Sequence, residues 1–420
     1  MEDIIPKIKL SKKNESEKMK PLLVDHENHP TLQPIIDAFE NSNEVTLGYS
    51  TIEKDGEETK PSLKKKLLYL TGSSLRDHLF NKTFQKYELV TNATPEETRM
   101  ILKFFGFSEI QPIDKEHITK YTKIEKSTNN PNNFYVNKWD SHGNEMGFSV
   151  FVKGQKIQID TLDKNDKYSL QTTPLRKFTN SIYEDAETRD FSVNSMYLKL
   201  KNSNGDNTEL FDPMRRGVHD IVHDEIHLIE DIEEKFKINP NLMFDLAELS
   251  ARFCEDHKIS EGNARDIREN YPKVKNLPKL FKKSFIHAIS NEDVPTYYYL
   301  KNLFVSGLFF KLFPNLKITP PHIGLFDDYL FITAYLLQNN HDGLIFSTLT
   351  NLEWHKFEIK EILFIKSLIE WAKNNDETMF KKLLIHVTEI PIKKAIKFMK
   401  IFDKEKEFKK LLEKYSIDII

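Results

Sequence analysis

The stretch LLYLTGSSLRDHLFNKTFQKYELVTNA, residues 67–93, decides the fold of this chain. Its apolar runs and turn residues predict a strand, a tight turn, a helix and a second strand. Gly72 and Ser73 lie at the turn, where backbone N–H groups at the start of a helix can hold a phosphate. The stretch therefore predicts a phosphate-binding corner between a strand and a helix.

The same stretch resembles the signature of class II tRNA nucleotidyltransferases (CCA-adding enzymes) and bacterial poly(A) polymerases. In that family the segment runs as L-V-G-G-x-V-R-D, a short spacer, and then D-x-D-L-x-T-N-A. Ser73 replaces the second glycine of this pattern. The resemblance implies that the corner handles a nucleotide triphosphate. The matching residues are Gly72, Arg76, Asp77, Leu89, Thr91, Asn92 and Ala93.

Further segments extend the resemblance over roughly residues 65–320, far beyond a chance motif match. They are similar to the family's R-R-D-F-T-x-N-A element, its E-x-x-D-P-x-x-G-x-x-D-L turn and a helical phrase that ends in L-F-P-E-L. The corresponding stretches are ETRDFSVNSMYL (187–198), ELFDPMRRGVHDI (209–221) and LFVSGLFFKLFPNL (303–316). The matching residues of the first two are Arg189, Asp190, Phe191, Asn194, Asp212, Pro213, Gly217 and Asp220.

Each matched group also has a structural interpretation. Arg76 and Asp77 form either a triphosphate site or an ion pair at the start of a helix, and the sequence leaves both open. Arg189, Asp190 and Asn194 are nucleotide-binding candidates, but we favour a hydrogen-bonded corner that fixes the fold. The nearby acids are expected to be solvated loop charges rather than ligands, and they are Asp163, Asp166 and Asp185.

The two carboxylates that should hold two divalent metals are altered. The resemblance implies an aspartate at both positions, where this chain has Lys86 and Glu88. A lysine at a metal-ligand position opposes a divalent cation by Coulomb repulsion. Asp160, in the expected strand KIQIDTLD (156–163), lies two residues after Gln158 on the same strand face. We expect Glu88 and Asp160 to be residual catalytic and weak metal-binding candidates, with Mg²⁺ as the cofactor if the protein is active.

The base-selecting element is altered as well. The family places E-D-P-x-R on the first turn of the next helix, and its side chains pair with the incoming base. Here Ile238, Asn239 and Leu242 stand at three of those positions. The aliphatic Leu242 cannot hydrogen-bond a base edge. Joint loss of metal ligation and base selection indicates relaxed selection on catalysis.

Hydrophobic periodicity predicts an α+β chain. A nucleotidyltransferase palm of mixed or antiparallel strands, with helices on one face, is followed by an all-α neck, body and tail. We expect a polar extension with one short helix at residues 1–66, the palm at 67–222, the neck and body at 223–320 and the tail at 321–420. Aromatic stripes in the helical part are expected to form its core.

Composition limits the function further. The net charge is −3, so no overall basic balance indicates nucleic acid, although local patches can still bind RNA. The single cysteine, Cys254, excludes an internal disulfide and favours the cytoplasm or another reducing compartment. No apolar run reaches membrane-spanning length, so no membrane partner is expected.

The stretch from Lys381 onward is locally basic. Lysines between apolar positions suit a tail that binds an RNA backbone, and the interleaved acids suit a solvated helical face at least as well. The N-terminal extension is a candidate docking element for a protein partner. The RNA-binding candidates are Lys393, Lys394, Lys397, Lys400, Lys409 and Lys410.

Three functions remain open. The first is an impaired or inactive family member that binds RNA, with tRNA as one candidate, or serves as a structural or partner-binding subunit. The second is an active, metal-dependent RNA 3′-end nucleotidyltransferase that adds CCA or poly(A). The third is a protein-interaction scaffold without RNA binding. The altered metal and base positions favour the first, since fold alone does not decide function.

Overall fold

The computed structural model divides the chain into two compact units, Met1–Glu230 and Asp231–Ile420. Most of the polar N-terminal extension lies outside the described residues, as does Asp166. The finer division into palm, neck, body and tail stays a prediction. The structure describes residues 7–8, 31–46, 51–52, 58–59, 62–80, 82, 86–110, 132–139, 145–165, 176–200, 209–229, 232–274, 277–322, 328–374, 376–384 and 392–415.

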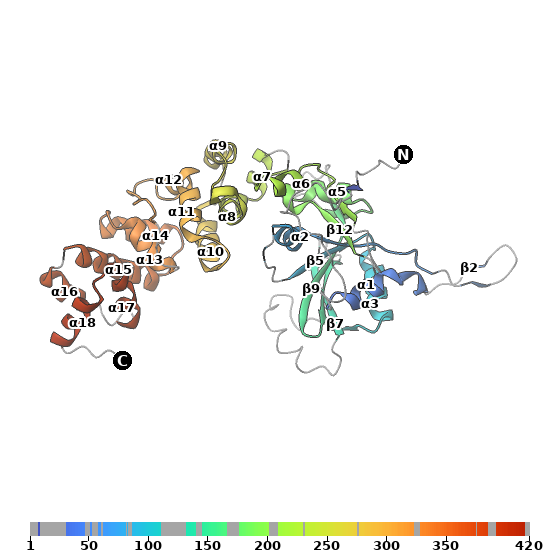
Figure 1. Cartoon of the computed structure of the whole chain (residues 1–420), viewed down its shortest axis with the longest axis horizontal. Helices are drawn as coiled ribbons and strands as arrows, with labels where there is room; N and C mark the ends of the chain where they lie inside the picture. The colour runs from blue at the N-terminus through green and yellow to red at the C-terminus, as the bar shows by residue number, and fades with distance from the viewer. Residues whose placement is uncertain are drawn as a thin grey trace. The chain divides into compact units, whose positions relative to one another are not determined.

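The first unit is built on one large mixed sheet (Figure 1). Its strands in the described residues are β1 (Lys7–Ile8), β4 (Leu68–Thr71), β5 (Tyr87–Thr91), β6 (Ser108–Glu109), β7 (Asn132–Trp139), β8 (Glu145–Val152), β9 (Gln155–Thr161), β12 (Tyr197–Leu200) and β13 (Glu209–Phe211). Their order is β1-β13-β12-β4-β5-β9-β8-β7-β6. The pairs β5/β9 and β6/β7 are parallel, and the other neighbours are antiparallel. Two further antiparallel strand pairs are separate from this sheet, β2 (Thr51–Ile52) with β3 (Glu58–Thr59) and β10 (Asp163–Asn165) with β11 (Arg176–Phe178).

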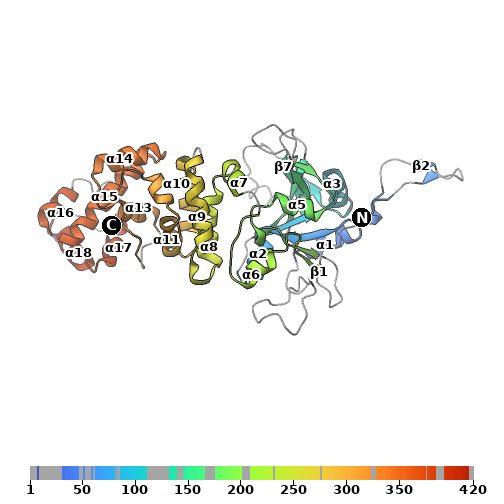
Figure 2. The same cartoon turned by 90° about the horizontal axis from the view of Figure 1, so that it is seen from above.

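The strand, helix and strand expected at 67–93 are present as β4, α2 (Gly72–Leu79) and β5. After them, α3 (Pro95–Phe104) begins in a capping box, in which Thr94 accepts a hydrogen bond from the Glu97 amide and the Glu97 carboxylate accepts one from the Thr94 amide. The short helix expected in the extension is α1 (Gln33–Glu40). Both views show α1 beside α3 (Figures 1 and 2).

Both faces of the sheet are covered at β4, and α5 lies on one of them. Tyr69 and Val90 pack against Ala186 of α5 (Ile182–Thr188). Leu70, which points to the opposite face, is 1% exposed. Every residue of β4 is buried, and such a strand needs a packed layer on each side. This arrangement brings α5 to the face that carries the candidate site.

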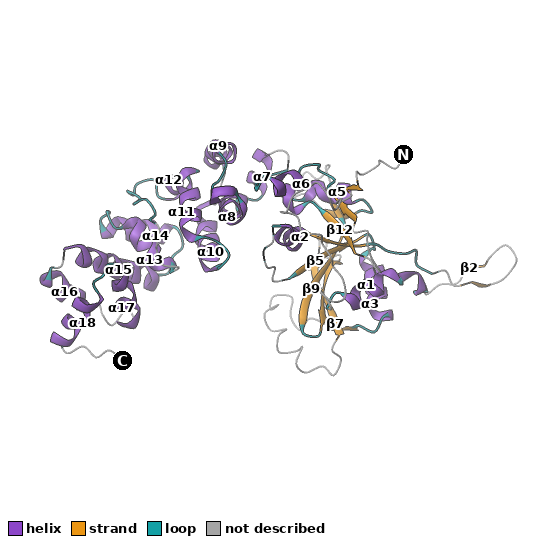
Figure 3. Ribbon diagram, viewed as in Figure 1, coloured by secondary structure: helices purple, strands orange, loops and turns teal. Residues whose placement is uncertain are grey.

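The second unit is helical throughout its described residues (Figure 3). No helix among those described is both long enough and apolar enough to cross a bilayer. The helices from residue 217 onward are α6 (Gly217–Val222), which still belongs to the first unit, and then α7 (Ile232–Ile238), α8 (Leu242–Phe253), α9 (Glu261–Asn270), α10 (Leu277–Ser290), α11 (Thr296–Val305), α12 (Leu308–Leu312), α13 (Tyr329–Leu337), α14 (Asp342–Asn351), α15 (Lys356–Asn374), α16 (Glu377–Leu384), α17 (Ile392–Ile401) and α18 (Glu405–Lys414).

Aromatic side chains form the core of this unit, as their helical spacing predicted. Phe281 lies 4.9 Å from Phe285 and 6.5 Å from Phe309 between ring centroids, and all three are at most 1% exposed. The apolar run at 297–313 forms the two helices α11 and α12. They separate at Gly307, whose φ of +80° lies in the left-handed region that ends a helix.

Candidate functional site

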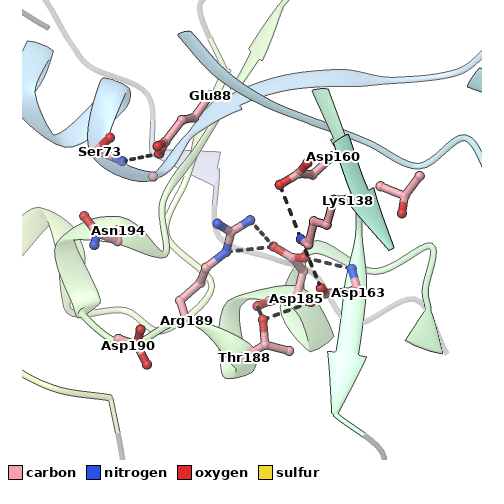
Figure 4. Close-up of a pocket in the computed structure, with 12 residues that line it drawn as sticks. Ser73, Glu88, Lys138, Asp160, Asp163, Asp185, Thr188, Arg189, Asp190 and Asn194 are labelled. Atoms are coloured by element: carbon pink, nitrogen blue, oxygen red, sulfur yellow. Dashed lines mark hydrogen bonds and ion pairs between the residues drawn. The ribbon is translucent and has the colours of Figure 1, made fainter. Parts of the chain in front are cut away.

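A polar cavity of about 260 Å³ lies in the first unit, on the sheet face that α5 partly covers (Figure 4). Glu88 and Asp160 share this face, because Val90 pairs with Asp160 and Glu88 pairs with Gln158 across the parallel β5/β9 ladder. The cavity is lined by Gly72, Ser73, Glu88, Lys138, Asp160, Thr161, Asp163, Asp185, Thr188, Arg189, Asp190 and Asn194.

Glu88 is held from two sides. One carboxylate oxygen accepts a hydrogen bond from the Ser73 amide at 2.8 Å, and the other lies 2.6 Å from Lys86 Nζ. Burial alone would raise the pKa of Glu88, but Lys86 and Ser73 outweigh it, and the pKa lies below its usual value. Glu88 is therefore a carboxylate already neutralised by a lysine, and the backbone N–H of the turn binds this carboxylate.

Asp160 is paired in the same manner. Its Oδ2 accepts a hydrogen bond from Gln158 Nε2 at 2.9 Å and lies 3.3 Å from Lys138 Nζ. Its Oδ1 is buried and has no hydrogen-bond partner among the described residues. Each of the two residual metal-binding candidates thus forms an ion pair with a lysine, Glu88 with Lys86 and Asp160 with Lys138.

Two glycines make room for these carboxylates. Gly72 has a φ of +63°, and a Cβ there would collide with Glu88 Oε2. A Cβ at Gly147, the β8 partner of Asp160, would collide with Asp160 Oδ1. The positions of both carboxylates therefore depend on missing side chains beside them.

We expect Gly147→Ala to lower the free energy of unfolding by about 1–3 kcal/mol, because the new methyl group must displace the Asp160 carboxylate. Urea denaturation followed by circular dichroism measures the loss. In an Asp160→Ala background the same change should cost less, since the colliding atoms are gone. Gly262→Ala, at a helical glycine whose nearest atom would lie at 3.9 Å, should not destabilise. Equal losses from Gly147→Ala in both backgrounds would contradict this close approach.

Asp185 is the centre of a buried network, which corrects the expectation that Asp163 and Asp185 are solvated. The two are 3% and 2% exposed. Asp185 accepts hydrogen bonds from Arg189 at 2.8 and 3.1 Å, from the Tyr197 hydroxyl at 2.6 Å and from the Asp163 amide at 2.8 Å. Burial alone would lower the pKa of Arg189, but Asp185 outweighs it and raises that pKa well above its usual value. Thr188 also donates to Asp163 at 3.2 Å.

The matched residues of the two family elements do not all reach the cavity. Arg76 and Asp77 are 6% and 5% exposed, form an ion pair at 2.6 Å and do not line it. Arg76 donates to Asn194 Oδ1 at 3.1 Å. Gly72, Ser73, Arg189, Asp190 and Asn194 do line the cavity.

A two-metal centre does not fit this donor set. It would need several carboxylates around a common point and no competing cation. Within the described ranges no three His, Cys, Asp or Glu side chains converge at the cavity. One oxygen of each carboxylate also has a lysine ammonium beside it, at 2.6 Å for Glu88 and 3.3 Å for Asp160.

Lys138 is the functional residue that sequence reasoning missed. It follows Val136 by two residues and would share its strand face in a regular strand. The register between β7 and β8 shifts at this point, where Val136 pairs with Phe148 and Lys138 with Gly147. This bulge turns Lys138 to the face of Asp160.

The basic tail lysines are partly engaged within the chain. Lys394 lies 2.6 Å from Glu361 and 3.1 Å from Asp328. Glu405 carboxylate oxygens lie 3.8 Å from Lys400 and 2.5 Å from Lys409. The candidates whose residues are exposed to solvent are Lys393, Lys397, Lys400 and Lys410.

Together, the mixed sheet, the glycine-serine corner and the polar cavity define a nucleotidyltransferase palm. Residues 68–227 match the model of the poly A polymerase head domain. The CCA-adding enzyme of Staphylococcus saprophyticus is 25% identical over 169 residues, which cover 40% of this chain and 32% of that protein. Poly(A) polymerase I of Haemophilus influenzae is 24% identical over 253 residues, covering 59% and 48%. The chain thus spans about a third to a half of the length of these curated relatives.

Solved structures agree on the fold. The Thermotoga maritima CCA-adding enzyme complexed with tRNA superposes with a TM-score of 0.54 at 16% identity, covering 83% of this chain and 78% of that one. The head segment therefore matches the poly A polymerase head domain, and the resemblance to class II tRNA nucleotidyltransferases and poly(A) polymerases is confirmed.

Proposed function

We propose that this chain is a nucleotidyltransferase-like protein whose palm does not carry out metal-dependent nucleotidyl transfer and which acts by binding RNA. The observation that carries the proposal is the lysine on each residual carboxylate, Lys86 on Glu88 at 2.6 Å and Lys138 on Asp160 at 3.3 Å. Both ammonium groups stand where a divalent cation would need free carboxylate oxygens.

The electrostatics of the cavity support this proposal. Phosphoryl transfer depends on cations that neutralise charge on the phosphate oxygens. The lining holds five carboxylate side chains and two basic ones, so a triphosphate without its metals meets net repulsion. A lysine bound to a carboxylate neither replaces a metal nor activates an attacking hydroxyl.

The RNA-binding half of the proposal rests on the fold and on local charge. One solved neighbour is a CCA-adding enzyme complexed with tRNA, and a palm that has lost transfer can keep its surface for RNA. The net charge of −3 requires that contact come from local basic patches. Exposed tail lysines such as Lys393 and Lys410 are candidates for one.

The experiment is a 3′-extension assay on the full chain. The substrates are tRNA lacking its CCA end and a short oligoribonucleotide, with each nucleoside triphosphate and either Mg²⁺ or Mn²⁺. We expect no extended product, because the metal positions are neutralised. A filter-binding assay on the same samples should show retained RNA, with affinity that falls as salt rises.

Two outcomes would contradict the proposal. Extension that Glu88→Ala abolishes would establish an active enzyme, and product length would separate CCA addition from tailing. Absence of both extension and RNA retention would leave a protein-interaction scaffold.

A further inference from the structure

A second cluster of chemically active side chains lies outside the cavity, in and just after α6. The stretch HDIVHDEIH, residues 219–227, carries histidines at 219, 223 and 227. His219, Asp220 and Glu225 each offer one ligand atom, and these atoms lie within 4.8 Å of one another. In the part of the chain that the structure describes, this is the one such group of three or more.

A fourth donor lies next to two of these three. His227 Nδ1 lies 3.1 Å from Asp220 Oδ1 and 3.8 Å from Glu225 Oε2. His219 Nδ1 lies 3.5 Å from the same Asp220 oxygen. Ligands placed about 2.0–2.1 Å from a tetrahedral ion lie about 3.3–3.4 Å apart. The separations of Asp220 Oδ1 from the two imidazoles, 3.5 and 3.1 Å, are close to this value, and the 3.8 Å between His227 and Glu225 is slightly longer.

We propose that this stretch binds one divalent transition-metal ion of the zinc class. Its ligands are the imidazoles of His219 and His227 and the carboxylates of Asp220 and Glu225. Two nitrogen and two oxygen donors suit Zn²⁺, Ni²⁺ or Cu²⁺. Mg²⁺ and Ca²⁺ prefer oxygen donors alone and suit the site poorly.

The site is anchored rather than assembled from loose surface groups. Asp220 is fully buried, and its Oδ2 accepts a hydrogen bond from the Ser192 hydroxyl, which leaves Oδ1 toward the histidines. The Ser192 amide also donates to the His227 carbonyl at 3.0 Å. Ser192 therefore fixes two of the ligand residues at once, as partners behind metal ligands commonly do.

A third histidine orients the first. The rings of His219 and His223 stack with centroids 4.1 Å apart, and His223 Nδ1 donates to the His219 carbonyl at 2.9 Å. This contact holds the His219 ring on the side of Asp220. His223 is a positioning residue and not a ligand.

One side chain competes with the ion. Arg216 Nε lies 3.4 Å from Asp220 Oδ1, and the Arg216 side chain is 51% exposed. It can move into solvent when an ion takes the same oxygen. Removing it should therefore strengthen metal binding.

The test uses the full chain without a histidine tag, treated with chelator and dialysed. Calorimetric titration with Zn²⁺ should give one ion per chain. Co²⁺ in its place should give the strong visible absorption of a four-coordinate ion. His219→Ala and Glu225→Gln should each weaken Zn²⁺ binding by at least about tenfold, and both side chains are about half exposed, so the fold should persist.

Matched variants decide the position of the ion. Arg216→Ala should tighten binding, and Glu88→Gln in the cavity should leave it unchanged, which also separates this site from the proposed function. Absence of Zn²⁺ binding would overturn the proposal. So would a full equivalent of Zn²⁺ bound with equal affinity by the combined His219→Ala, Glu225→Gln variant.

Discussion

Asp185→Ala should lower the free energy of unfolding of the first unit by about 3–5 kcal/mol, the usual cost of removing one partner from a buried charge pair. The substitution removes the buried Asp185 carboxylate from the Arg189 guanidinium, whose side chain is 25% exposed. It also removes the acceptor of the Tyr197 hydroxyl and of the Asp163 amide. Three polar groups lose a partner together, so the loss should exceed that of a single hydrogen bond.

Urea denaturation followed by circular dichroism measures this loss. Hydrogen exchange adds a local measurement, because the β12 amides should exchange faster in the variant. Lys164→Ala is the matched control on the same helix contact. It removes an ion pair to Glu184 whose side chains are 43% and 40% exposed, and it should cost at most about 1 kcal/mol. A loss of similar size in both variants would contradict the central position of Asp185.

Removing the two lysines should create a measurable Mg²⁺ site. In the combined variant Lys86→Asp, Glu88→Asp, Lys138→Ala, two aspartates face the cavity and Asp160 loses its ammonium partner. One unit of repulsive charge at 4 Å is worth about 1–4 kcal/mol between water and a partly buried site. We therefore expect Mg²⁺ affinity to rise by at least about tenfold, measured by calorimetry.

The single variants divide the effect between the lysines. Lys86→Ala should also raise the pKa of Glu88, because the ion pair that lowers it is gone. Lys82→Ala removes an exposed lysine nearby and should change nothing. Mg²⁺ binding by the natural chain as strong as by the combined variant would show that the lysines do not block the site.

Sequence reasoning succeeded where the chemistry is local. A glycine-serine turn between a strand and a helix follows from the residues of 67–93, and so does the placement of Glu88 on β5. The common face of Gln158 and Asp160 follows from the two-residue period of strands, and the regular β5/β9 ladder then places Glu88 beside Gln158. These features depend on neighbours in sequence or on one unbroken pairing.

Sequence reasoning failed where contacts between residues distant in sequence determine the burial or the direction of a side chain. Asp163 and Asp185 look like loop acids because nothing near them in sequence shows Tyr197 as the partner of Asp185 across 12 residues. Lys138 was missed because an irregular register between β7 and β8 reverses its direction, and no local pattern predicts where a bulge falls. Burial of acids and bulge positions are properties of the assembled sheet.

The two glycines beside Glu88 and Asp160 have a consequence for how this domain can change over time. Gly72 and Gly147 determine the room for the carboxylates, whereas Lys86 and Lys138 reach in with 56% and 30% of their side chains exposed. Shape and charge are thus encoded by different residues. Substitutions at the two partly exposed lysines can change the charge of the pocket and leave the shape set by the glycines intact. This makes the palm evolvable and a convenient starting point for protein engineering.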